Sequence, residues 1–430
     1  MHRSLLALLL PIAANGAAPV ATGWGQWGNT PNQQSYSASP LPSASLKEWE
    51  WQGATKNRVV GSPVVAHGRV WVGSDDGNMY NLDAATGAEV WKFHVPTTHP
   101  KCRGFDCEHG LCPCSKIRST PAVDVEGASY FGAYDRSIYK LDKAGRMVWN
   151  VSTGGTIYGP ATLDSDGTLY IGSFDLHLYA LDSGTGAVKW KKDLGAHGDC
   201  GIALGAGKNA NVLMTQSNEG GNCTQWPPPG EGEDGGECFV FSLDKRTGKE
   251  LWRHKTGKPA GGGMIVGDAY LSGSWNHYVS SLDIATGKLN WRLNVGGEVE
   301  TRPAYHAGVA YFSAEESKTL WAVDAASGKV LWKYAGAAQE LNGSPSVAAG
   351  IVYVGSNDKY LHAVNATTGR LLFKFLTCAN VFSSAAVDER GMVYIGCNTA
   401  TGGPGPGSQP GTGAAYAVNP TVWQQLSQAW

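Results

Sequence analysis

The sequence predicts an all-β protein, an eight-bladed β-propeller of four-stranded blades. Three observations predict it: a turn motif that repeats, four short strand-like runs in each repeat, and an unused strand ahead of the first repeat. The motif Asp-x-x-x-Gly-x-x-x-Trp first occupies 83–91. It returns at 182–190, 244–252, 283–291 and 324–332, with looser copies from Asp142 and Asn365. Copies about 40 residues apart indicate stacked units that cannot bury their apolar faces alone.

One repeat, residues 61–95, shows the unit. Its four runs are rich in β-branched and aromatic residues and are bounded by Gly, Asp, Asn or Thr, as strands joined by tight turns are. The runs cover 62–65, 69–73, 79–82 and 89–93. Four short strands in such a repeat are typical of a propeller blade.

The Asp, Gly and Trp of the turn motif each have a structural role. The Asp side chain can bond the backbone two residues on, and Gly supplies the positive φ that closes the turn between third and fourth strands. The Trp then falls on the outer strand, where its large flat ring is expected to fill the seam between neighbouring blades.

Blades one to seven can be laid end to end along the chain. Their inner strands are predicted to begin near Ser62, Thr120, Gly159, Gly201, Gly262, Arg302 and Ser344. An eighth blade starts at Ser383 and reaches Asn419 without a clear fourth strand. We expect residues 46–51 to supply that strand and to close the ring, which removes open sheet edges. The alternative is that the tail, 421–430, supplies it.

The domain boundaries follow from this count. Residues 1–16 have the pattern of a secretion signal, with a short apolar run at 5–10 that is too short to span a membrane. A lead-in covers 17–45, the propeller 46–420 and a C-terminal tail 421–430. We therefore expect a secreted or otherwise extracytoplasmic monomer with no membrane span. Glycan acceptor motifs occur at Asn150, Asn222, Asn342 and Asn365.

Charge and cysteine content narrow the function. A net charge of −2 with 16 % charged residues argues against a nucleic-acid partner. Nine cysteines in an exported chain predict disulfides with one thiol left over. The candidates for disulfide bonding are Cys102, Cys107, Cys112, Cys114, Cys223, Cys238, Cys378 and Cys397. Cys223 with Cys238 is the most natural pair, and the other pairings stay open.

The cysteines and the long insertions 96–117, 218–238 and 398–413 all map to one face of the predicted disc. Elaborated loops on a rigid scaffold are where function usually lies. The first cluster, with His99 and His109 nearby, holds enough ligands for zinc. It lacks the Cys-x2-Cys spacing of structural sites, so disulfides are favoured and no metal site is predicted there.

The segment Gly23-Trp24-Gly25-Gln26-Trp27-Gly28-Asn29, followed by blades that end Leu-Asp-x-x-Thr-Gly-x-x-x-Trp, resembles the pyrroloquinoline-quinone (PQQ) repeat family. The resemblance covers roughly 23–419. It implies the propeller fold, but the family includes both quinoprotein dehydrogenases and cofactor-free scaffolds, so fold alone does not assign a function. In the enzymes, PQQ and a Ca²⁺ held by Glu, Asn and Asp lie on the axis. This sequence has neither adjacent cysteines nor a Cys-x-x-Cys-His haem motif.

The repeat register names the residues expected around the axis. The residue three before the Pro of each Ser/Thr-Pro motif should face it, and these positions hold Val60, Arg118, Ile157, Glu300, Asn342 and, by weaker alignment, Asp199 and Phe382. Arg302 replaces the usual small residue just before its Pro. The candidate axial cofactor pocket therefore comprises Arg118, Asp199, Glu300, Arg302 and Asn342. Arginines suit the carboxylates of PQQ, and the oxygen-bearing side chains suit Ca²⁺.

Two interpretations follow. The first is a binding module that contacts a protein or glycan partner through the cysteine-rich loop face. The alternative is a PQQ- and Ca²⁺-dependent quinoprotein dehydrogenase that oxidises an alcohol or a sugar. The sequence alone names no catalytic residue and does not decide whether the protein is an enzyme.

Overall fold

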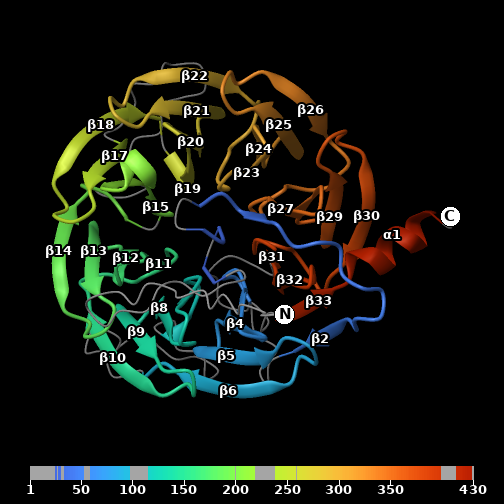
Figure 1. Cartoon of the computed structure of the whole chain (residues 1–430), viewed down its shortest axis with the longest axis horizontal. Helices are drawn as coiled ribbons and strands as arrows, with labels where there is room; N and C mark the ends of the chain where they lie inside the picture. The colour runs from blue at the N-terminus through green and yellow to red at the C-terminus, as the bar shows by residue number, and fades with distance from the viewer. Residues whose placement is uncertain are drawn as a thin grey trace, which may run out of the picture.

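The computed structural model describes residues 25–26, 28–30, 33–52, 59–96, 115–198, 200–217, 238–257, 259–398 and 413–428. Eight sheets, each with four antiparallel strands, stand around a central axis (Figure 1), so the predicted eight-bladed propeller is confirmed. The N-terminal strand β2 (Trp49–Trp51) pairs antiparallel with β33 (Gly413–Val418) and completes the last blade. The tail does not supply this strand, because it forms the helix α1 (Pro420–Gln428).

Each of the first four blades holds four consecutive strands, ordered from the axis outwards. Blade 1 contains β3 (Val64–Ala66), β4 (Arg69–Gly73), β5 (Asn78–Asp83) and β6 (Glu89–His94). Blade 2 contains β7 (Ala122–Val123), β8 (Ser129–Gly132), β9 (Ser137–Leu141) and β10 (Met147–Ser152). Blade 3 contains β11 (Thr162–Leu163), β12 (Thr168–Gly172), β13 (His177–Asp182) and β14 (Val188–Asp193). Blade 4 contains β15 (Ala203–Leu204), the short 3-10 helix η4 (Gly207–Asn209), β16 (Val212–Gln216), β17 (Cys238–Asp244) and β18 (Glu250–Thr256).

The remaining blades follow the same order. Blade 5 contains β19 (Pro259–Val266), β20 (Ala269–Ser274), β21 (Tyr278–Asp283) and β22 (Leu289–Asn294). Blade 6 contains β23 (Ala304–His306), β24 (Val309–Ala314), β25 (Thr319–Asp324) and β26 (Val330–Tyr334). Blade 7 contains β27 (Ser346–Ala348), β28 (Ile351–Gly355), β29 (Tyr360–Asn365) and β30 (Leu371–Leu376), and β1 (Tyr36–Ser37) joins its inner edge. Blade 8 contains β31 (Ala386–Val387), β32 (Val393–Asn398), β33 and β2.

The repeated tryptophans fill the seams as the sequence predicts. Each indole N–H donates to a backbone carbonyl in the turn of the following blade, at 2.7–3.2 Å. The ring lies over the turn glycine, whose φ is +69° to +78°. A Cβ on that glycine would stand only 2.6–2.9 Å from the ring. The glycine is thus required twice, for its backbone conformation and for the close approach of the indole. The ring–turn pairs are Trp49–Gly87, Trp91–Gly145, Trp149–Gly186, Trp190–Gly248, Trp252–Gly287, Trp291–Gly328 and Trp332–Gly369.

Candidate functional site

A polar cavity of about 260 Å³ lies on the axis of the ring. Apart from Gly261 at the start of β19, its walls are the segments just before the inner strands. Because all inner strands run the same way, these segments meet at one end, here called the upper end. The residues that line it are Val60, Gly61, Ser62, Arg118, Thr120, Tyr158, Pro160, Gly261, Glu300, Thr301, Asn342, Ser344, Phe382 and Ser384.

The structure brings together part of the predicted axial set. Arg118, Glu300 and Asn342 line the cavity. Val60 and Phe382 line it too. Ile157 is fully buried, and its neighbour Tyr158 lines the cavity instead. The register argument therefore finds the right segments, with an offset of one residue at this blade.

The structure does not place the other two residues of the predicted pocket, Asp199 and Arg302, in the cavity wall. Asp199 lies outside the described residues. Arg302 is not among the residues that line the cavity; it is completely buried, and its guanidinium donates to the side chains of Gln33 and Ser35. The sequence could not reveal this, because Gln33 and Ser35 precede the first repeat and belong to no register.

Arg118 forms the cationic wall of the cavity. Its Nε and Nη2 donate to the two carboxylate oxygens of Asp75 at 2.8 and 2.7 Å. The guanidinium also lies over the ring of Tyr134, 5.4 Å from its centre. Burial disfavours its charge, but the hydrogen bonds and charge of Asp75 outweigh burial and raise the pKa of Arg118. Arg118 is therefore a fixed positive group with its orientation set by a bidentate pair.

The opposite wall is rich in oxygen. Asn342 Nδ2 donates to Glu315 Oε2 at 3.4 Å, while Asn342 Oδ1 is buried with no partner among the described residues. Glu315 is only 8 % exposed. Burial, and next the charge and hydrogen bond of Glu300, raise the pKa of Glu315 to about 9. These surroundings favour the protonated form of Glu315 at neutral pH.

Sequence reasoning missed a second ring of residues around the upper end. They occupy one register position in the turn between the second and third strands of each blade, one residue before Asp76, Asp135, Asp175, Glu316 and Asp358. Four of them contact the loop that enters the next blade, whereas Asn357 contacts the loop that enters its own blade. The contacts are Asp75 with Arg118, Tyr134 with Tyr158, Phe174 with His197, Glu315 with Asn342 and Asn357 with Glu340. The repeat alignment contains this signal, because the five residues share a column.

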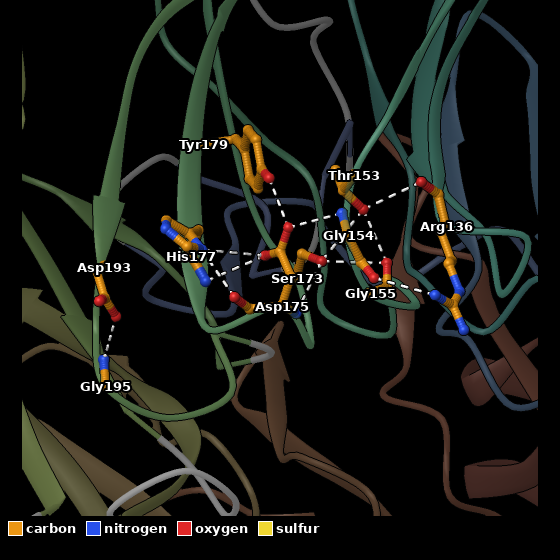
Figure 2. Close-up of polar contacts among 10 residues, drawn as sticks. All are labelled: Arg136, Thr153, Gly154, Gly155, Ser173, Asp175, His177, Tyr179, Asp193 and Gly195. Carbon is orange, nitrogen blue, oxygen red and sulfur yellow. Dashed lines mark hydrogen bonds and ion pairs between the residues drawn. The ribbon is translucent and has the colours of Figure 1, made fainter.

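Other polar residues near the upper end of the axis connect neighbouring blades. Figure 2 shows the contact between blades 2 and 3, where Asp175 accepts hydrogen bonds from Gly154 N at 2.8 Å and Tyr179 Oη at 2.6 Å. Beside it, Ser173 Oγ donates to the Gly155 carbonyl at 3.1 Å, and Thr153 contacts Ser173. These groups satisfy one another, so their role is structural.

The predicted cysteine-rich binding face is not supported. Cys102, Cys107, Cys112, Cys114 and Cys223 lie outside the described residues. Cys378 and Cys397 form a disulfide, so both are disulfide-bonded as expected, and the structure gives the pairing that the sequence left open. Cys238 is also disulfide-bonded. Cys200, Cys238 and Cys397 are buried, so these side chains present no surface to a partner.

The Trp–Gly seams, the eight blades and the axial cavity define a PQQ-type repeat propeller. A family model described as "Outer membrane protein assembly factor BamB" matches residues 43–106, 108–220 and 239–393, and the chain belongs to this family. Among curated proteins, the dehydrogenase subunit of the quinone alcohol dehydrogenase of Gluconobacter oxydans is 29 % identical over 147 residues. This stretch covers 32 % of the chain and only 18 % of that relative. The corresponding subunit of Komagataeibacter europaeus is 28 % identical over 138 residues, 30 % of the chain and 17 % of the relative.

Solved structures share the fold at low sequence identity. The quinohemoprotein alcohol dehydrogenase of Comamonas testosteroni superimposes with a TM-score of 0.69 at 18 % identity, over 95 % of this chain and 81 % of that one. A europium-containing methanol dehydrogenase gives 0.72 at 15 % identity, over 92 % and 99 %. BamB of Moraxella catarrhalis gives 0.59 at 14 % identity, over 86 % and 96 %. None of the helices in the described part of the chain is both long and apolar enough to cross a membrane.

Proposed function

We propose that the protein is an exported quinoprotein dehydrogenase that binds PQQ and Ca²⁺ in the axial cavity and oxidises an alcohol or a sugar. One observation carries the proposal: the cavity sets the fixed cation of Arg118 on one wall and Glu300 and Asn342 on another, with Glu315 hydrogen-bonded to Asn342. A planar ligand with carboxylates and a bound cation needs both kinds of wall. The curated quinone-dependent relatives support the choice of cofactor.

The residues present fit both groups. Ca²⁺ takes oxygen ligands from carboxylates and amides. Glu300 and the unpartnered Asn342 Oδ1 would supply two of them from the cavity wall, and Glu315, which is hydrogen-bonded to Asn342, would supply a third. No three acidic, His or Cys side chains of the described chain form a metal cluster, so the amide oxygen is needed. Arg118 Nη1 makes one long hydrogen bond of 3.5 Å to Tyr134 Oη and has a second N–H for a ligand carboxylate, whereas Nε and Nη2 are used by Asp75.

The roles of the chain's own groups follow from these positions. When bound, PQQ would supply the two-electron acceptor. Arg118 would orient it through one carboxylate, and Tyr158 and Phe382 would narrow the mouth and exclude water. Glu300 is the carboxylate that reaches the cavity, so it would accept the hydroxyl proton of the substrate.

Export is part of the proposal. Residues 1–16 carry the signal-like pattern, and the Cys378–Cys397 disulfide is the kind of bond that persists in oxidising compartments. The exported chain would consist of the lead-in 17–45, the propeller 46–420 and the tail 421–430.

Calorimetric titration with PQQ, with and without Ca²⁺, tests the proposal. We expect one site per chain that requires Ca²⁺, and Arg118→Met should weaken PQQ binding about 10- to 100-fold, as loss of a charge-assisted hydrogen bond does. Arg136→Met is the matched control, because Arg136 bonds the Gly154 carbonyl on the rim outside the cavity. Absence of heat and of thermal stabilisation at high PQQ and Ca²⁺ concentration would overturn the proposal in favour of a cofactor-free binding scaffold.

A further inference from the structure

The end of the axis opposite the cavity is crossed by one segment of chain. It consists of the described residues 25–26, 28–30 and 33–37, here called the axial strap. In Figure 1 it is the blue trace that passes over the centre of the ring and leaves past β27 towards β2. The inner strands end on the strap, so it lies at the lower end of the axis, whereas the cavity residues precede those strands.

Backbone hydrogen bonds fasten the strap to three inner strands. The amides of Val123, Tyr305 and Val347 donate to strap carbonyls at 2.7, 2.8 and 2.9 Å. Their acceptors are Gly25, Gln34 and Ser35. In addition, β1 lies parallel to β27, in register from Tyr36 and Val347. Blades 2, 6 and 7 are therefore tied to the same short segment.

Glutamine side chains add two further blades. Gln26 Oε1 accepts the amide of Leu163 in blade 3 at 3.0 Å. Gln34 Nε2 donates to the Ile265 carbonyl in blade 5 at 3.0 Å. Gln33 Nε2 donates to Thr162 Oγ1 at 3.4 Å. Gln26, Gln33 and Ser35 have no exposed surface, so the strap inserts polar side chains between inner strands rather than lying on top of them.

Arg302 is the anchor of the strap. It has no exposed surface, and its Nη2 donates to Ser35 Oγ at 2.7 Å while Nη1 bonds Gln33 Oε1. Burial lowers the pKa of Arg302 to about 9. Gly28 fits against the guanidinium, where an added Cβ would stand 2.9 Å from it.

The strap backbone is held in an uncommon shape. Asn29, Gln33 and Ser35 have φ values of +64°, +67° and +49°, in the left-handed region that side chains disfavour. Such conformations persist where surrounding contacts over-determine them. Here the contacts come from five blades, so the strap has a fixed conformation and is an integral part of the propeller.

We infer that the axial strap is a plug that closes the lower end of the channel, so that ligands and solvent reach the axial cavity through its upper mouth only. Arg302 is the positioning residue that latches the plug. The inference does not depend on which ligand the cavity takes, and its test uses no cofactor.

Thiol labelling of the full chain tests the plug. Thr162→Cys places a thiol next to the Gln33 side chain, on the cavity side of the strap, at a position with no exposed surface. We expect this thiol to resist a small methanethiosulfonate reagent, and to react at least about tenfold faster when Arg302→Met is added, because a latched segment opens only locally once its anchor is lost. Peptide mapping by mass spectrometry separates this thiol from Cys200. Arg390→Met is the matched control, since Arg390 bonds Asp388 in blade 8 and touches no strap residue.

Hydrogen exchange keeps the inference testable if the variant folds poorly. In the unmodified protein the amides of Val123, Tyr305 and Val347 should exchange slowly and with one common rate, because one segment covers all three. Arg302→Met or Gln33→Leu should accelerate all three together. Rapid labelling of Thr162→Cys with the strap intact would overturn the plug, and so would exchange of these three amides at unrelated rates.

Discussion

The seams between blades offer a comparison within one molecule. In seven of them the outer-strand Trp lies over the turn glycine of the next blade. The seam between blades 7 and 8 is different, because β33 continues into α1 and no Thr-Gly turn follows. There the outer strand carries Phe373, which stacks with Trp423 of α1 at 6.5 Å between ring centres. Trp423 Nε1 donates to Glu48 Oε1 at 2.8 Å, just before β2.

The two kinds of seam perform the same physical task with different parts. In each, a tryptophan ring packs across the seam and its indole N–H donates to an acceptor. In the seven repeated seams the indole N–H and its carbonyl acceptor are 32 to 55 residues apart and belong to the repeat. At the closing seam the partners come from opposite ends of the chain, and Asn419 strengthens the contact by donating to the carbonyls of Ser43 and Leu46 at 2.9 Å.

The largest effect is expected at a repeated seam. Trp291→Ala removes a half-buried ring and its hydrogen bond to the Ala325 carbonyl, and should lower the free energy of unfolding by about 3 kcal/mol. Urea denaturation followed by circular dichroism measures the change. A loss below about 1 kcal/mol would show that the seam tryptophans contribute little to the stability of the contact between blades.

The second-largest loss of stability is expected on substitution of a turn glycine. Gly328→Ala imposes a side chain at φ +71° and places Cβ 2.6 Å from the Trp291 ring, so we expect a loss of about 2 kcal/mol. Gly350→Ala separates the two causes, because Gly350 has φ +75° but no neighbouring atom within 4 Å. It should cost about 1 kcal/mol, the backbone part alone. Equal losses in the two variants would contradict the role of indole contact.

The smallest effect is expected at the closing seam. Trp423→Ala should cost about 1–2 kcal/mol, because the ring is half-buried and the main-chain pairing of β2 with β33 remains. Hydrogen exchange should nevertheless rise at both chain ends together, in α1 and in β2. Faster exchange in α1 alone would indicate that the helix is an appendage and that β2 closes the ring without it.

The repeat explains why so much of the fold was predictable. The turn glycines, the seam tryptophans and the closing strand at 46–51 follow from local pattern and from counting strands. Arg118, Glu300 and Asn342 were found because they occupy one register position. The ring that includes Asp75 and Glu315 occupies a second such position that was overlooked.

The sequence by itself determined the architecture, because each blade is specified by turn chemistry and strand periodicity within about 40 residues. Only the tertiary structure decided where the unrepeated residues lie. Arg302 is buried on the strap because Gln33 and Ser35, far away in the chain, provide acceptors there. Trp423 closes the ring because the eighth blade has no turn of its own to meet Phe373. A local pattern predicts contacts that repeat, whereas a contact made once between distant segments depends on the closure of the whole ring.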